Sequence, residues 1–79
     1  MANIKTLPKL KWGESGVVVE IHGGFGLVRN LESLGVRVGK SITKISSQIW
    51  GGPQVIKIGN TQIAIGFGMA RRIFVEVKE

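Results

Sequence analysis

The sequence predicts a small all-β barrel of about five short strands, with one short helix inserted after the first strand. Twelve glycines separate short runs that are rich in valine and isoleucine, as is typical of small barrels. Gly59-Asn60 stands between two such runs as a hairpin turn. With 79 residues the chain has room for one domain, and we expect an N-terminal arm over residues 1–12 and a barrel over residues 13–79.

The composition restricts the chemistry that this domain can perform. The chain has no cysteine, which excludes a disulfide scaffold, a thiolate zinc site and a cysteine nucleophile. It has one histidine and five acidic residues. All five acidic residues are glutamates, and their spacing does not form the carboxylate pair of acid–base catalysis. We therefore expect a binding protein rather than an enzyme.

The net charge of +6 favours acidic partners. The basic residues are scattered, and Arg71-Arg72 is the one contiguous pair. Nucleic-acid binding is disfavoured, because the aromatic residues stand singly beside glycines instead of alternating with basic residues along a strand. The sequence shows neither the apolar run of a signal peptide at its start nor the roughly 20 apolar residues of a membrane span, so we expect a soluble protein.

Residues 17–21 alternate in the manner of a strand with one face in the core. The pattern places three residues on the core face, Val17, Val19 and Ile21. The opposite face then carries Val18, Glu20 and His22.

The segment from Leu27 to Leu34 predicts the helix, because its apolar residues share one helical face. Gly35 follows at the position where helices end in the left-handed conformation. Two turns of helix are unstable alone in water, so this helix must pack on the sheet.

The Gly59-Asn60 turn fixes the register of the best-defined hairpin, in which residue 58 opposes 61 and residue 56 opposes 63. One face of that hairpin then carries Ile56, Ile58, Ile63 and Ile65. Two further strands are expected over residues 41–47, with a bulge or strong twist because Ile42 and Ile45 are three apart, and over residues 72–77. A helical insertion among five such strands indicates an SH3-like barrel.

A partner surface is predicted around exposed aromatic residues near loops. Its candidates are Trp50, Phe67, Met69, Arg71 and Phe74. For Trp50 the alternative stays open that it caps the open end of the barrel. Pro53, which follows Gly52, is assigned to a turn because proline cannot donate into a central ladder.

Glu20 and His22 are the candidate metal ligands. They share a strand face about 7 Å apart by strand geometry and could supply two ligands to a divalent ion. The alternative is a pair of solvent-facing polar residues at the end of a strand.

The ordered motifs of the chain resemble those of the ferrous iron transport protein A (FeoA) family. These motifs are, in chain order, Gly13-x-x-Gly16-x-Val18, Arg29-x-Leu31-x-x-Leu34-Gly35-Val36-x-x-Gly39, Gly52-Pro53, and Ile63-Ala64-Ile65 followed by Ala70-x-x-Ile73-x-Val75. The resemblance spans residues 7–76. The chain departs from the family pattern at Gly66, where arginine is common, and at Val38, where proline is common.

The resemblance implies an SH3-like fold and a cytoplasmic accessory role in ferrous iron uptake. It further implies docking on a large membrane GTPase-permease, ferrous iron transport protein B. Direct binding of a divalent transition metal, Fe or Zn, is the alternative, and weak self-association through barrel edge strands also stays open. The residues expected to have structural roles are Gly35, Gly39, Pro53, Gly59 and Asn60.

Overall fold

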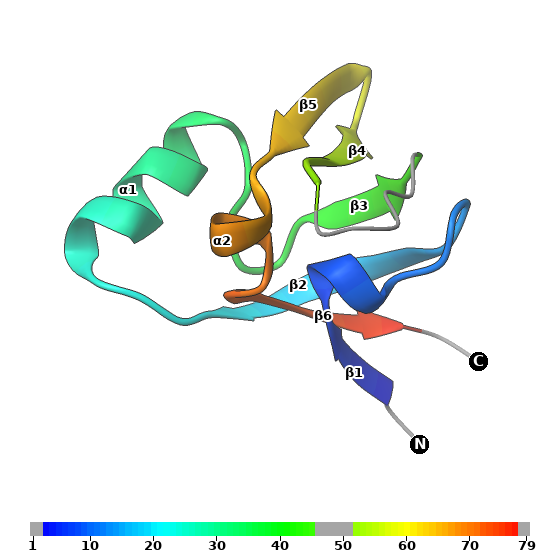
Figure 1. Ribbon diagram of the computed structural model, residues 1–79, viewed down its shortest axis with the longest axis horizontal. Coiled ribbons are helices and arrows are strands. Elements are labelled where there is room, and N and C mark those ends of the chain that lie inside the picture. The colour runs from blue at the N-terminus through cyan, green and yellow to red at the C-terminus, as the bar shows by residue number, and fades with distance from the viewer. Residues whose placement is uncertain (1–2, 46–51, 78–79) are drawn as a thin grey trace.

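Six short strands form one antiparallel sheet in the computed structural model of the protein, which describes residues 3–45 and 52–77 (Figure 1). The strands are β1 (Asn3–Thr6), β2 (Ser15–Ile21), β3 (Ser41–Lys44), β4 (Gln54–Ile58), β5 (Thr61–Ile65) and β6 (Ile73–Val77). The helical segments are the 3-10 turn η1 (Leu7–Lys9), α1 (Phe25–Ser33) and α2 (Phe67–Ala70). The predicted fold class is confirmed, and the structure adds a sixth strand and a second short helix.

The sheet runs in the order β1-β6-β2-β3-β4-β5, so the last strand lies between the first two. Strand β1 lies within the predicted N-terminal arm and forms one edge of the sheet. It pairs antiparallel with β6, with Asn3 opposite Val77, so the first and last strands lie side by side (Figure 1). The sheet is therefore held together by pairing between the most distant parts of the sequence.

The β4–β5 hairpin has the predicted register. Ile58 opposes Thr61, and Ile56 opposes Ile63. Gly59 has a φ of +60°, whereas no described residue other than glycine has a positive φ. This matches a type II′ turn, in which only the first central residue needs the left-handed region.

Strand β2 contains a bulge that reverses its alternation. Val18 is fully buried, whereas Val17 and Val19 are only half-buried, so the predicted core face was wrong at these positions. The pairing of β2 with β6 shifts between Val18 and Glu20, which leaves Val19 as an extra residue. Beyond the bulge, Ile21 packs against the core as predicted.

Helix α1 is anchored to the sheet by its C-terminal end. Gly35, with a φ of +96°, donates its N–H to the Glu32 carbonyl at 3.0 Å, and Val36 donates to the Leu31 carbonyl at 2.9 Å. These two bonds form a Schellman motif, and Leu31 and Val36 are both fully buried. Leu34, which belonged to the predicted apolar stripe, is exposed.

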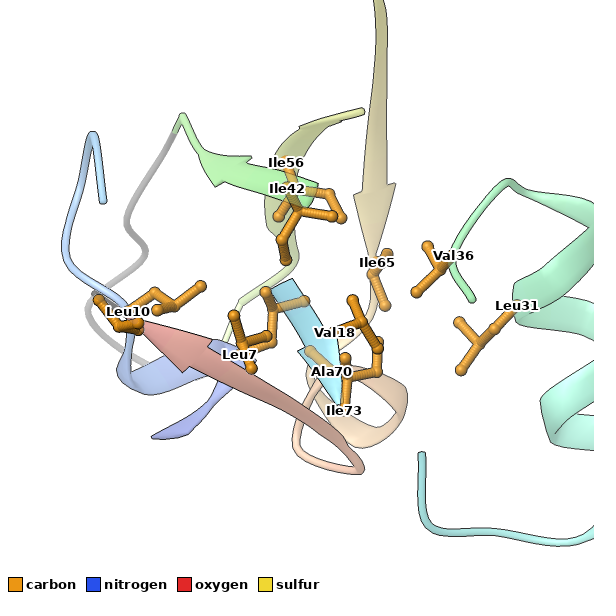
Figure 2. Packing of buried hydrophobic residues seen from close by; sticks show 12 residues of the cluster. Leu7, Leu10, Val18, Leu31, Val36, Ile42, Ile56, Ile65, Ala70 and Ile73 are labelled. Atoms are coloured by element: carbon orange, nitrogen blue, oxygen red, sulfur yellow. The ribbon is translucent and has the colours of Figure 1, made fainter. Parts of the chain in front are cut away.

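Among the described residues, twelve buried apolar side chains form the core between the curved strands (Figure 2). Leu7 and Leu10, from and just after η1, lie at one end, and Leu31 and Val36 lie at the other. Ala70 of α2 is also fully buried, so the short helix is packed into the core.

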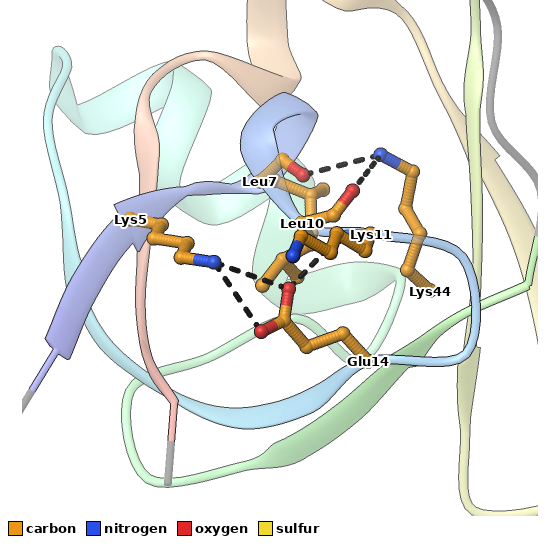
Figure 3. Close-up of polar contacts among 6 residues, drawn as sticks. All are labelled: Lys5, Leu7, Leu10, Lys11, Glu14 and Lys44. Carbon is orange, nitrogen blue, oxygen red and sulfur yellow. Dashed lines mark hydrogen bonds and ion pairs between the residues drawn. The ribbon is translucent and has the colours of Figure 1, made fainter. Parts of the chain in front are cut away.

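Strand β3 buries a lysine. Ile42 and Lys44 both point inward, so the strand alternates regularly. Lys44 is only 1% exposed, although its side chain carries an ammonium group. The Lys44 ammonium donates to the carbonyls of Leu7, Pro8 and Leu10 at 3.3, 3.4 and 3.2 Å (the first and third drawn in Figure 3). Burial lowers the pKa of Lys44, and the three carbonyls supply an acceptor for each proton of the ammonium.

Glu14 joins the same N-terminal segment from the opposite side (Figure 3). Its carboxylate accepts the Lys11 backbone N–H at 2.9 Å and lies 3.3 Å from the Lys5 ammonium. The bond from Lys11 holds the pKa of Glu14 below its usual value, with a smaller contribution from Lys5. The backbone of the same turn pairs with Lys44, which donates to the Glu14 carbonyl and accepts from Gly13.

Replacing Lys44 with methionine should destabilise the fold. The variant K44M keeps the length of the side chain but leaves buried carbonyls without a donor, which costs about 1–3 kcal/mol. Chemical denaturation monitored by circular dichroism measures the loss. The control K57M removes an exposed lysine from neighbouring β4 and should change the free energy of unfolding by less than about 0.5 kcal/mol. Equal stability of K44M and K57M would contradict this role of Lys44.

Acid should destabilise the protein partly through Glu14. Because the folded state lowers the pKa of this carboxyl, its contribution is complete above the ordinary glutamate pKa of about 4.3 and is lost as the pH falls through the lower folded value. The variant E14Q should therefore lose less stability than the wild type between neutral pH and about pH 3. Denaturant titrations at several pH values measure this difference. The control E32Q, which removes an exposed carboxylate from α1, should follow the wild type.

Candidate functional site

The short helix α2 positions most of the residues predicted to contact a partner. It follows β5 directly, and its backbone is fixed by bonds from Ala70 N–H to the Gly66 carbonyl at 2.8 Å and from Arg71 N–H to the Phe67 carbonyl at 3.0 Å. Phe67 is 41% exposed and Arg71 is exposed, whereas Met69 is half-buried against the core. Phe67 and Arg71 therefore belong to the surface, and Met69 serves mainly to hold the helix in place.

Phe74 is the second residue of β6 and faces the end of β2. Its ring is half-buried, and its centroid lies 4.4 Å from that of His22, with the two rings inclined at 45°. Glu20 is directly opposite Phe74 in the β2–β6 pairing. The structure thus brings the predicted partner residue Phe74 together with both predicted metal ligands.

An open pocket of about 280 Å³ lies at this place. It is lined by His22, Arg71, Arg72 and Phe74. The backbone sets its shape, because the His22 N–H donates to the Arg72 carbonyl at 2.8 Å where β2 ends and β6 begins. From the sequence, Arg71 and Phe74 were candidate partner residues, and Arg72 was noted only as the basic neighbour of Arg71. The pairing of β2 with β6 is what brings His22 beside them.

Glu20 and His22 bond to each other across the surface. The Glu20 Oε2 and His22 Nε2 atoms are 2.7 Å apart, and both side chains are more than half exposed. Imidazole nitrogen and carboxylate oxygen suit a divalent transition metal, but a protein zinc site usually takes three or four protein ligands. Residues 3–45 and 52–77 contain no group of three or more potential acidic, histidine or cysteine ligands.

The remaining predicted residues are distributed over the turns. Trp50 lies outside the described residues. Pro53 is exposed just before β4, and the exposed Asn60 completes the hairpin turn after Gly59. Gly39 has a φ of +96° and donates its N–H to the Val18 carbonyl at 2.8 Å, which aligns the start of β3 with β2.

One exposed aromatic residue, Phe25, was not identified as a surface residue from the sequence. Phe25 at the start of α1 is 78% exposed, and the Arg29 guanidinium lies 5.4 Å from its ring centroid. Trp12 is also exposed, while its indole N–H donates to the Ile45 carbonyl at 2.9 Å.

Within the part of the chain that the structure describes, no helix has the length and apolar character needed to cross a membrane.

Comparison with known proteins relates the chain to one family over most of its length. The family model described as FeoA domain matches residues 5–77. A protein of Methanocaldococcus jannaschii described as a putative Fe(2+) transport protein A is 38% identical over 69 residues, which covers 87% of this chain and 82% of that protein.

Solved structures give the same relationship. A crystal structure of an iron uptake regulatory protein (FeoA) matches with a TM-score of 0.88 and 33% identity, covering 95% of this chain and all of that one. The zinc-complexed FeoA of Stenotrophomonas maltophilia, described as an SH3 domain protein, matches with a TM-score of 0.73 and 25% identity over 95% of this chain and 88% of that one. A manganese-dependent transcriptional repressor, 18% identical, shares the fold over 99% of this chain and 44% of its own. The chain belongs to the FeoA family, whose members are named for ferrous iron transport.

Proposed function

We propose that the protein is a non-enzymatic, cytoplasmic accessory of ferrous iron uptake that docks on the cytoplasmic region of the membrane GTPase-permease, ferrous iron transport protein B. The observation that supports docking is the surface around α2 and the start of β6. Here exposed Phe67 and Arg71 stand on a helical turn whose Ala70 is buried in the core. Family membership supports the choice of partner.

The α2 surface has the composition of a protein contact site. Aromatic and arginine side chains contribute most of the binding energy in many interfaces, above all when the backbone beneath them is rigid. Phe67 leaves part of its ring in water in the free protein, and Phe74 is also partly accessible. Binding would remove this apolar area from water without a change of fold.

Replacing Phe67 with alanine should weaken binding to the soluble cytoplasmic region of the transporter by roughly tenfold or more, since the ring is an exposed aromatic anchor. A nitrogen-15 NMR titration measures the affinity and shows which amides shift, with the largest changes expected at residues 66–74. The matched control F25A removes the more exposed ring of α1 and should bind like the wild type. Absence of binding at high micromolar concentration, or a loss confined to F25A, would overturn the proposal.

Binding of a divalent transition metal is the second candidate function. It is favoured by the 2.7 Å approach of Glu20 to His22 and by the zinc that the Stenotrophomonas relative holds. In this chain the pair supplies two ligands, so water or another molecule would have to complete the coordination.

The variant H22A tests the metal candidate. Calorimetric titration with Zn²⁺ should show at least a tenfold loss of affinity in H22A relative to the wild type, because one of two ligands is removed. The control E32Q removes an exposed carboxylate elsewhere and should leave the affinity unchanged. If H22A binds zinc as the wild type does, the Glu20–His22 pair is not the site.

A further inference from the structure

We propose that the pocket lined by His22, Arg71, Arg72 and Phe74 binds a carboxylate from an acidic segment of the protein partner. This inference rests on the proposed function and specifies the chemistry by which the partner is recognised. The supporting observations are the shape of the pocket, the unpaired charge at its rim and the rigidity of the backbone that carries it.

The pocket has the size and composition of a side-chain receptor. Its volume of about 280 Å³ exceeds that of a single acidic side chain and leaves room for the flanking peptide. Its lining combines the aromatic residue Phe74 with two arginines. An apolar ring next to arginine donors favours a ligand that carries a charged end on an aliphatic stem, as glutamate does.

The two arginines have no counterion among the described residues. Neither Arg71 nor Arg72 appears in an ion pair or a side-chain hydrogen bond in that part of the chain, and both are exposed. Glu20, the carboxylate at this end of the sheet, is bonded to His22. Each guanidinium therefore keeps its donors free for a carboxylate, whose two oxygens match the planar fork of arginine.

The backbone holds both arginines in place before any ligand binds. The Arg71 and Arg72 N–H groups donate to the carbonyls of Phe67 and Met69 at 3.0 Å each. The Arg72 carbonyl in turn accepts the His22 N–H. Only the arginine side chains need to be ordered on binding, which limits the entropic cost.

An acidic peptide fits this pocket better than nucleic acid does. Duplex binding depends on neutralising many phosphates along a continuous basic surface, and single-strand binding depends on several stacking rings. This pocket offers two arginines and one phenylalanine that is already in contact with His22. The positive net charge of the chain would also speed the approach of an acidic partner.

The test uses the full chain and a pair of variants with equal net charge. R71Q/R72Q removes the pocket arginines, and R37Q/K40Q removes two exposed cations from the loop after α1, so each lowers the net charge of +6 by two. NMR titrations with a capped hexaglutamate peptide, a capped hexaglutamine peptide and inorganic phosphate give the affinities. Hexaglutamate should shift His22 and Phe74, and its affinity should fall roughly tenfold or more in R71Q/R72Q but stay within about twofold of the wild type in R37Q/K40Q.

Three outcomes would overturn the inference. They are equal weakening in both double variants, equal binding of hexaglutamine, and saturable phosphate binding at His22 and Phe74 without peptide binding there. The same variants titrated with the transporter's cytoplasmic region separate the two proposals. Failure of every protein to bind rejects the proposed docking, whereas equal binding by all of them rejects only the carboxylate pocket.

Discussion

The buried ammonium of Lys44 is the interaction on which the architecture most depends. It connects β3 to the carbonyls of η1 and of Leu10 just after it, although β2 and β6 lie between β3 and β1 in the sheet. The sheet alone would leave the N-terminal segment attached only at its edge. With Lys44 bonded to that segment, Leu7 and Leu10 close one end of the core, and 79 residues without a disulfide enclose a continuous apolar cluster.

The position of the candidate site follows from the same arrangement. Strand β6 lies between β1 and β2, so the residues just before and within it come beside the end of β2. Arg72 and Phe74 thereby meet His22, which lies 50 and 52 residues earlier in the sequence, respectively. The core residue Ala70 holds the preceding turn, and the side chains of Phe67 and Arg71 are left facing solvent.

The features predicted from the sequence are those set by local chemistry. Gly59 and Gly35 were identifiable because a two-residue hairpin and a helix end each require a left-handed residue at a fixed position. The bulge at Val19 was not identifiable, because it arises from the pairing of β2 with β6 and no local sequence pattern indicates it. The burial of Lys44 was missed because lysine side chains are rarely buried, so a lysine in a strand is normally expected to face solvent. The carbonyls that accept its hydrogen bonds lie in a distant segment of the sequence. The pocket likewise depends on the β2–β6 register, so the sequence identified His22, Arg71 and Phe74 separately but did not show that they lie together.

The pairing of Asn3 with Val77 places the entry and exit of the fold side by side. A domain with this property can be carried within or beside another domain, because the incoming and outgoing chain need span little distance and no core residue is displaced. The occurrence of the same fold in less than half the length of a manganese-dependent repressor agrees with such portability. Joining the two ends by a short linker and opening the chain at an exposed turn, such as Gly59-Asn60, is for the same reason a geometrically permitted rearrangement of this fold.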